Sequence, residues 1–196
     1  MTYNKPDTKL DKCIYVAEKI IPPDLCDSIV QDIETRKWDK HEWYNNAENS
    51  WHSEETKELD VQSSTPKLHQ TLSKFIIEAG TQYTQNYSFP FVDRTGQFMN
   101  NFSPIRFNRY EPGQIMRQHH DHIHSIFDGN DKGVPVLSFI LIFNDDYEGA
   151  DLYFWKDTVV KLGKGDIVMF PSCFLFPHGV TDATKGKRYS AVAWGW

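Results

Sequence analysis

Residues 110–121 read Tyr-Glu-Pro-Gly-Gln-Ile-Met-Arg-Gln-His-His-Asp, and a further histidine follows much later at position 178. His119 and Asp121 are two residues apart, so on an extended strand both side chains point to one side and can reach one ion, whereas His120 points away. A third ligand must come from elsewhere in the chain, and His178 is the natural candidate. Two imidazoles and one carboxylate on one face of a six-coordinate metal form the ligand set of non-haem Fe(II) sites. The pattern therefore predicts an iron site formed by His119, Asp121 and His178.

Three more histidines surround this motif, at positions 120, 122 and 124. On a strand they share the face opposite to His119, and together they could form a separate histidine cluster. Neutral histidines at a polar strand end are more often exposed to solvent than bound to metal. We therefore expect one metal site here and not two.

The sequence around and after the motif alternates short apolar runs with turns that contain glycine. Strands are predicted at residues 105–110, 136–143, 151–155, 166–170 and 188–194. Short strands separated by regular turn residues are typical of an all-β barrel or a double-sheet sandwich. The second half of the chain is therefore predicted to be a β barrel or sandwich.

The first half of the chain has a different texture. Pro22-Pro23-Asp24 opens a predicted helix that runs to residue 36, and a second helix is predicted at residues 66–87, where apolar residues recur at helical spacing. Both helices are interpreted as scaffold. Residues 43–64 between them are polar and show little periodicity, which favours a solvated surface loop, with a lid over the site as the alternative.

Length and charge limit the remaining possibilities. A chain of 196 residues suits one domain, and a net charge of −6 without a long basic run disfavours nucleic acid as a partner. No apolar run is long enough to span a bilayer and no secretory signal is recognisable, so we expect a cytoplasmic protein without membrane contact. The three cysteines fit neither a disulfide framework nor a zinc pattern.

The ordered motifs resemble those of the 2-oxoglutarate and Fe(II)-dependent dioxygenases of the prolyl 4-hydroxylase type. The resemblance covers residues 102–196 and implies that they form a double-stranded β-helix (jelly-roll, cupin-like) core. The whole chain is then mainly β, of the α+β class, and residues 1–101 supply supporting helices and the possible lid. In this pattern His119 is the first metal ligand. The matching segments are Tyr-x-x-Gly-x-x-x-x-x-His-x-Asp from Tyr110, Phe143-Asn144-Asp145-Asp146, Gly163-Lys164-Gly165-Asp166, His178-Gly179-Val180 and Arg188-Tyr189-Ser190.

The last strand carries the predicted co-substrate anchor. Arg188 and Ser190 share one strand face, and a planar guanidinium matches a carboxylate with two hydrogen bonds. The resemblance implies that Arg188 holds the distal carboxylate of 2-oxoglutarate and that Tyr110 and Ser190 add hydroxyl contacts. It also implies Fe(II) and O2, with ascorbate as reductant. One departure from the family is Ile142, where members often carry a tyrosine that helps to bind the distal carboxylate.

The sequence thus favours a hydroxylase that acts on a C–H bond, first of all on a prolyl residue of a peptide or protein, a procollagen-proline 4-dioxygenase-like activity. The alternative is hydroxylation of a free amino acid or small metabolite, and a third possibility is a metal-binding barrel without enzymatic activity. The nucleic-acid demethylase branch is disfavoured, because a second arginine is expected there at position 194, which is Trp194.

Overall fold

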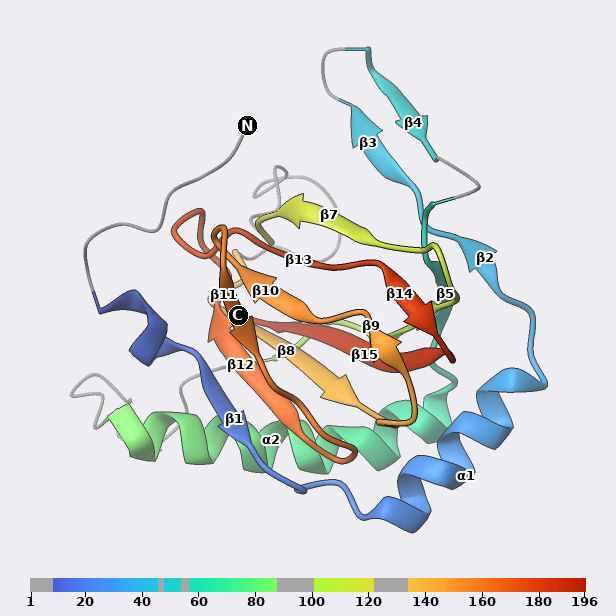
Figure 1. Ribbon diagram of the computed structural model, residues 1–196. Coiled ribbons are helices and arrows are strands. Elements are labelled where there is room, and N and C mark those ends of the chain that lie inside the picture. The colour runs from blue at the N-terminus through green and yellow to red at the C-terminus, as the bar shows by residue number, and fades with distance from the viewer. Residues whose placement is uncertain (1–8, 46–47, 54–56, 88–100, 122–133) are drawn as a thin grey trace.

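A computed structural model of the protein describes residues 9–45, 48–53, 57–87, 101–121 and 134–196. Two antiparallel sheets face each other, and two helices cover the outer side of the larger sheet (Figure 1). The mainly β architecture with supporting N-terminal helices is therefore confirmed. The larger sheet has the order β1 (Tyr15–Ala17), β12 (Ile167–Pro171), β8 (Leu137–Ile142), β15 (Arg188–Gly195), β6 (Arg106–Tyr110), β5 (Asp60–Ser63) and β2 (Asp39–Lys40).

The smaller sheet forms the opposite wall of the barrel. Its order is β11 (Thr158–Val160), β10 (Leu152–Phe154), β13 (His178–Val180) and β7 (Met116–His119). Two short pairs complete the strands: β9 (Glu148–Gly149) with β14 (Ala183–Lys185), and the hairpin β3 (Trp43–Asn45) with β4 (Ser50–His52). The helical elements are η1 (Leu10–Cys13), α1 (Pro23–Glu34) and α2 (Pro66–Tyr87).

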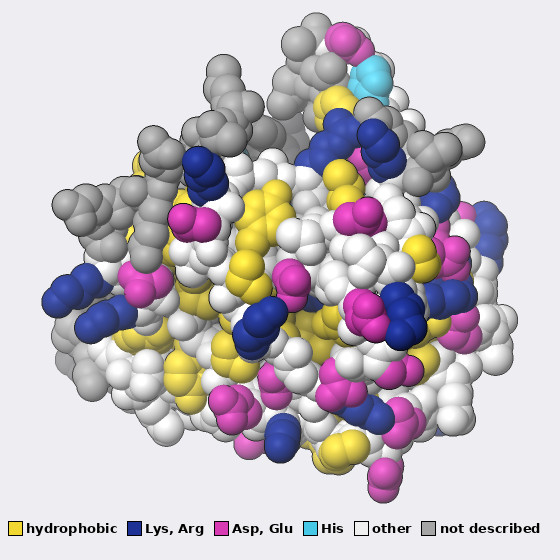
Figure 2. All heavy atoms as spheres, viewed as in Figure 1, with side chains coloured by type: hydrophobic (Ala, Val, Ile, Leu, Met, Phe, Trp, Pro, Cys, Tyr) yellow, Lys and Arg dark blue, Asp and Glu magenta, His cyan; other side chains and the backbone are white. Residues whose placement is uncertain are grey.

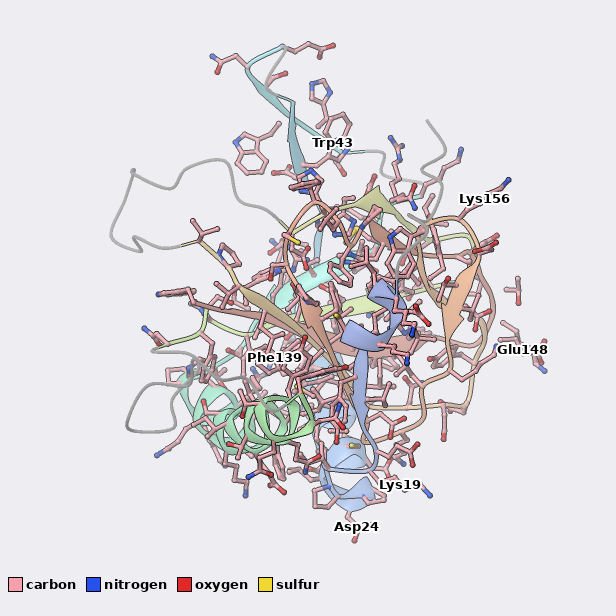
Figure 3. The ribbon with its side chains drawn as sticks, turned by 90° about the vertical axis from the view of Figure 1, so that its left-hand side faces the viewer. Lys19, Asp24, Trp43, Phe139, Glu148 and Lys156 are labelled. Carbon is pink, nitrogen blue, oxygen red and sulfur yellow. The ribbon has the colours of Figure 1, made fainter. Side chains whose placement is uncertain are left out.

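Strand β8 shows how the two layers are held together. All six of its residues are buried, because both of its faces are covered. Phe139 and Leu141 belong to the cluster shared with the helices, and Figure 3 shows Phe139 close to the helical layer. Ile140 and Ile142 belong to the second cluster, between the sheets. The barrel interior is therefore lined by alternate residues of each strand.

The helices follow the predicted pattern closely. Proline stands at the first turn of α1, where its missing N–H costs no hydrogen bond, and Ile29 and Ile33 face the core. This helix ends at Glu34, two residues before the predicted end, where the N–H of Thr35 bonds to the carbonyl of Asp32 and closes the last turn. Helix α2 has the predicted bounds, and it packs on β12 and β1.

The interpretation of residues 43–64 as a solvated loop is wrong for its second half. Strand β5 lies inside the larger sheet between β6 and β2, and Leu59 before it is fully buried. Two polar residues of β5 are buried because they have partners: Gln62 donates to the carbonyl of Ile33, and Asp60 pairs with Arg109 at 2.9 Å. The hairpin β3–β4 projects from the barrel, on the side opposite to the helices (Figure 1).

Acidic and basic side chains are interspersed on the face of the molecule shown in Figure 2. None of the helices in the described part of the chain has the length and apolarity needed to cross a membrane.

Candidate metal centre

The three predicted metal ligands lie together inside the barrel, at its open end. One ligand atom each from His119, Asp121 and His178 lie within 4.8 Å of one another. His119 and His178 are direct partners across β7 and β13, and their ring centroids are 4.5 Å apart. Cross-strand pairing therefore joins two histidines that are 59 positions apart in the sequence.

Gly179 allows the two strands to approach closely. A Cβ atom at this position would lie 2.7 Å from the carbonyl oxygen of Met116 and 2.7 Å from the hydroxyl of Tyr153. Any side chain here would push β13 away from β7 and would separate the two histidines. The glycine directly after His178 is thus part of the architecture of the site.

Both imidazoles are oriented in the same way by backbone groups. Nδ1 of His119 lies 2.8 Å from the carbonyl of Arg117, and Nδ1 of His178 lies 3.0 Å from the carbonyl of Phe176. A carbonyl only accepts, so each Nδ1 carries the proton and each Nε2 presents its lone pair. The Nε2 atoms lie 3.3 Å and 3.7 Å from the carboxylate oxygens of Asp121. This tautomer is the one that a metal ligand requires.

Asp121 is held from the other side by serine hydroxyls. Ser138 on β8 donates a hydrogen bond of 2.6 Å to Oδ2 of Asp121, and Ser138 in turn lies 2.8 Å from the hydroxyl of Ser172. Both serines are buried. The carboxylate is therefore fixed in orientation although it stands at the end of β7.

Burial and mutual charge shift the pKa values of the three groups. Burial lowers the pKa of His178 to about 4, because it outweighs the attraction of Asp121. Burial also acts against the charged form of His119, but the hydrogen bond and charge of Asp121 outweigh it, and its pKa is raised. Burial alone would raise the pKa of Asp121, yet the two histidines and Ser138 lower it. Asp121 is thus ionised and His178 neutral at neutral pH, the protonation states that a metal needs.

The donor set fits a divalent transition metal such as iron. Two imidazoles and one ionised carboxylate converge on one point, and such a set leaves positions for other ligands. His120 is exposed and does not belong to this group, while positions 122 and 124 lie outside the described residues. The expectation about a second histidine cluster therefore stays a prediction.

The three residues stand between two cavities. A cleft of about 450 Å³ opens beneath the hairpin β3–β4, and its lining includes Trp43, His41, Met116 and Trp194. Figure 3 shows Trp43 at the base of this hairpin, above the barrel. A narrower inner cavity of about 30 Å³ extends into the barrel. Both cavities share His119 and Asp121, so the metal centre faces an outer and an inner space.

The inner cavity is lined by the three predicted co-substrate residues. Arg188 is the direct partner of Tyr110 across β15 and β6, and its guanidinium lies 5.1 Å from the centre of the Tyr110 ring. Arg188 and Ser190 are each 1% exposed. Nε and Nη2 of Arg188 and the hydroxyl of Ser190 have no hydrogen-bond partner among the described residues. Buried polar atoms without partners are costly, and they indicate a place for an anionic ligand.

The inner cavity of about 30 Å³ has room for small molecules such as water. A five-carbon dicarboxylate at Arg188 requires lining side chains to move outward. Ile142 lies in the same apolar cluster as Tyr110 and is fully buried, so this position supplies no hydroxyl to such a ligand.

Sequence reasoning missed residues that line the outer cleft, above all Arg106. This arginine precedes Asn108 and Tyr110 by two and four positions, and all three line the inner cavity. Strand parity, applied to Arg188 and Ser190, would have found it. His41 and Trp43 carried no such signal, because they come from a segment without periodicity.

The comparisons with known proteins agree with this site. Residues 105–196 match the model of the 2OG-Fe(II) oxygenase superfamily. Prolyl 4-hydroxylase 1 of Arabidopsis thaliana is 31% identical over 111 residues, a match that covers 46% of this chain and 39% of that protein. The chain thus spans about two fifths of the length of this curated relative.

Solved structures show the same fold. A prolyl-4-hydroxylase of Pseudomonas putida has a TM-score of 0.61 at 22% identity and covers 93% of this chain and 91% of that one. A prolyl hydroxylase of Trichoplax adhaerens, in complex with a hypoxia inducible factor oxygen degradation domain peptide fragment, has a TM-score of 0.66 at 12% identity and covers 94% and 83%. Residues 105–196 are thus similar in sequence to the 2OG-Fe(II) oxygenase superfamily, and the chain has the double-stranded β-helix fold of these solved prolyl hydroxylases.

Proposed function

We propose that this oxygenase hydroxylates a C–H bond of a prolyl residue in a peptide or protein, with His119, Asp121 and His178 as the iron ligands. The observation that carries this proposal is the position of the three residues between an outer cleft and an inner cavity that ends at a buried arginine with two nitrogens free of hydrogen-bond partners among the described residues. The free donors of the inner cavity suit a carboxylate of the co-substrate once the lining moves outward, and the outer cleft suits the substrate. The metal centre would face both.

The co-substrate would be held by charge and hydrogen bonds at the inner end. Nε and Nη2 of Arg188 would bind the distal carboxylate of 2-oxoglutarate, and Ser190 and Tyr110 would add hydroxyl contacts. This anchoring fixes the other end of the co-substrate beside the three metal ligands. When bound, iron supplies the activation of O2 that couples decarboxylation of 2-oxoglutarate, to succinate and CO2, with insertion of one oxygen atom into a C–H bond.

The protein's own groups would act by orienting and by excluding water. The carbonyls of Arg117 and Phe176 keep the lone pairs of both imidazoles directed at the metal position, and Ser138 keeps the carboxylate of Asp121 in place. Phe154 and Phe170 pack against the ring of His178, at 5.5 Å and 4.6 Å between centroids, and cover its inner side. A reactive centre formed here would be shielded from solvent on the barrel side.

A peptide substrate is supported by the shape of the outer cleft. Strand β7 stands at the edge of the smaller sheet, and beyond the bridge of Ile115 to Glu58, which covers the start of its other side, this edge would be the place for an extended chain. The cleft above it is lined by Trp43, Trp194 and Met116, apolar side chains suited to a pyrrolidine ring. The Trichoplax adhaerens relative, described with a bound peptide fragment, supports the same substrate class.

The test is product analysis with Fe(II), 2-oxoglutarate and O2. Proline-containing peptides, free proline and nucleic acid are incubated with the enzyme, and succinate and the mass of each substrate are measured. We expect a peptide heavier by one oxygen atom on proline, formed in step with succinate, and faster turnover when ascorbate is added as reductant. Oxygen found only on the free amino acid would replace the peptide proposal by the small-molecule one, and modified nucleic acid would contradict both.

A further inference from the structure

Arg106 lies on the inner face of β6, at the end of the wall shared with β15. It is the direct partner of Val192, while Tyr110 is the partner of Arg188 at the other end of the same two strands. Four residues along a strand correspond to about 13 Å between Cα atoms. The barrel interior therefore carries two arginines, one at each end of this wall, and they line different spaces. Both arginines line the inner cavity, but Arg106 also lines the outer cleft, which Arg188 does not reach.

The guanidinium of Arg106 is held in place by neutral groups. Its Nε donates to Oδ1 of Asn108 at 3.2 Å, and its Cζ lies 5.5 Å from the ring centre of Trp194. Neither Nη1 nor Nη2 has a hydrogen bond or an ion pair with any residue that the structure describes. One hydrogen bond and one stacking partner thus fix the plane of the group and leave its two terminal nitrogens for a ligand.

The other arginine of this strand provides a contrast. Arg109 faces outward, and its guanidinium pairs with Glu34 at 2.9 Å and Asp60 at 2.9 Å, with Glu111 at 3.7 Å. Its charge is fully neutralised by the protein. Arg106, three residues earlier on the opposite face, has no such carboxylate among the described residues, although it lies in a more enclosed position beside the metal centre.

The other charged groups of the cleft have partners within it. Glu58 lies 3.2 Å from Nδ1 of His41 and 3.9 Å from Nε of Arg117. Its carboxylate therefore faces the cation of Arg117. Asp121 is engaged by the two histidines of the metal centre. His120, exposed, completes the ionisable groups of the lining. The charge of Asp121 also attracts Arg106, but no carboxylate among the described residues of this lining forms an ion pair with its guanidinium.

We propose that Arg106 binds a carboxylate of the substrate and so makes the enzyme selective for a C–H bond close to an acidic group. This inference rests on the proposed function, because it places the substrate in the outer cleft. A carboxylate beside the hydroxylated residue has two sources: an acidic side chain next to proline in a peptide, or the α-carboxylate of a C-terminal or free proline. Both present the same planar anion to the two terminal nitrogens of Arg106.

Pairs of substrates that differ only in charge test this inference. N-acetyl-Ala-Pro-Asp-amide is compared with its Asn counterpart, N-acetyl-Ala-Ala-Pro with a free or an amidated C-terminus, and proline with prolinamide. Hydroxylation rates are measured with Fe(II) and 2-oxoglutarate. Binding is measured separately by calorimetry on protein loaded with Mn(II) and N-oxalylglycine, the unreactive amide analogue of 2-oxoglutarate, so that it does not depend on turnover.

We expect the acidic member of at least one pair to be preferred by the wild-type protein on the order of tenfold or more, as for a charge-assisted pair. Arg106→Gln, which keeps a side chain able to reach Asn108, should remove most of this preference, and Arg106→Lys should restore part of it. Affinity for 2-oxoglutarate should stay within about threefold of wild type in both variants, less than the effect of one lost hydrogen bond. Arg117→Gln is the matched control, a cleft cation with a carboxylate partner, and should keep the preference.

Three results would overturn the inference. The first is equal binding of acidic and neutral substrates by the wild-type protein, and the second is a preference that persists in Arg106→Gln. The third is a large loss of 2-oxoglutarate affinity in Arg106→Gln, which would assign the residue to the co-substrate. Failure of the proposed function is a separate result: hydroxylation at a residue other than proline, with the charge preference intact, would leave the role of Arg106 standing.

Discussion

Replacing Arg188 with methionine distinguishes two roles of this arginine, the binding of a ligand and the stabilisation of the fold. Methionine keeps much of the volume and removes the charge. Arg188 is 1% exposed, and it has no carboxylate partner among the described residues. Breaking a buried ion pair costs about 3–5 kcal/mol, because the remaining charge is left alone. No such charge would be left here, so the free energy of unfolding of the ligand-free protein should change by only about 1 kcal/mol, the scale of the lost contact with Tyr110.

The same replacement should strongly weaken co-substrate binding. A buried charge-assisted pair to a carboxylate is worth on the order of 2–5 kcal/mol, so Arg188→Met should raise the dissociation constant of 2-oxoglutarate by about thirtyfold or more. Calorimetry with Mn(II)-loaded protein measures this constant, and urea unfolding measures stability. Lys187→Gln is the control, since Lys187 is a neighbouring surface cation that pairs with Glu111 at 3.0 Å.

Two results together would refute this reasoning. One is unfolding that becomes easier by several kcal/mol, which would reveal a structural ion pair of Arg188. The other is an unchanged affinity for 2-oxoglutarate in Arg188→Met. An affinity loss of the same size in Lys187→Gln would show a general effect of net charge.

Three further predictions concern the support of the site. Ser138→Ala removes the hydrogen bond that orients Asp121 and should weaken metal binding by about ten- to a hundredfold, measured by titration with Co(II); Ser172→Ala, one bond further out, should do less. Burial would raise the pKa of Asp60, but its ion pairs with Lys40 and Arg109 lower it. The contribution of Asp60 to stability is therefore present above the ordinary aspartate pKa and is lost as pH falls through the lowered pKa. Asp60→Asn should lower the free energy of unfolding at pH 7, and in a series of unfolding experiments toward acid pH this free energy should converge with that of the wild type. Amide hydrogens of the hairpin β3–β4 should exchange more slowly when Mn(II), N-oxalylglycine and a proline peptide are all bound, and equal exchange in every mixture would contradict a covering role of the hairpin.

Local sequence patterns predicted those parts of the fold that depend on periodicity. Helix α2 was found over its full length because Leu72, Ile76 and Ala79 recur on one face. The central strands were found because β8 and β15 are short, largely apolar segments next to turn residues. The spacing of two predicted His119 and Asp121 on one side of a strand, but β7 ends at His119, so Asp121 reaches the site from the segment after the strand.

Long-range pairing could not be predicted from the sequence. Strand β5 contains Asp60 and Gln62, which read as surface residues, and their burial depends on Arg109 and Ile33 far away in the chain. The short strand β13 pairs with both β10 and β7, so its extended form depends on segments far away in the chain. Strand parity would have placed Arg106 on the inner face, but only the folded chain reveals that no carboxylate among the described residues forms an ion pair with it.

The measurement that tests the central claim most directly is retention of Fe(II) under anaerobic equilibrium dialysis with 2-oxoglutarate, compared among single alanine variants. The account predicts that the wild-type protein and His120→Ala retain about one ion per chain, while His119→Ala, Asp121→Ala and His178→Ala lose it and remain folded. Neighbouring histidines, one inside the ligand group and one outside it, would thus behave differently. An iron-replete His119→Ala, or loss of iron in His120→Ala alone, would contradict the assignment of the metal centre.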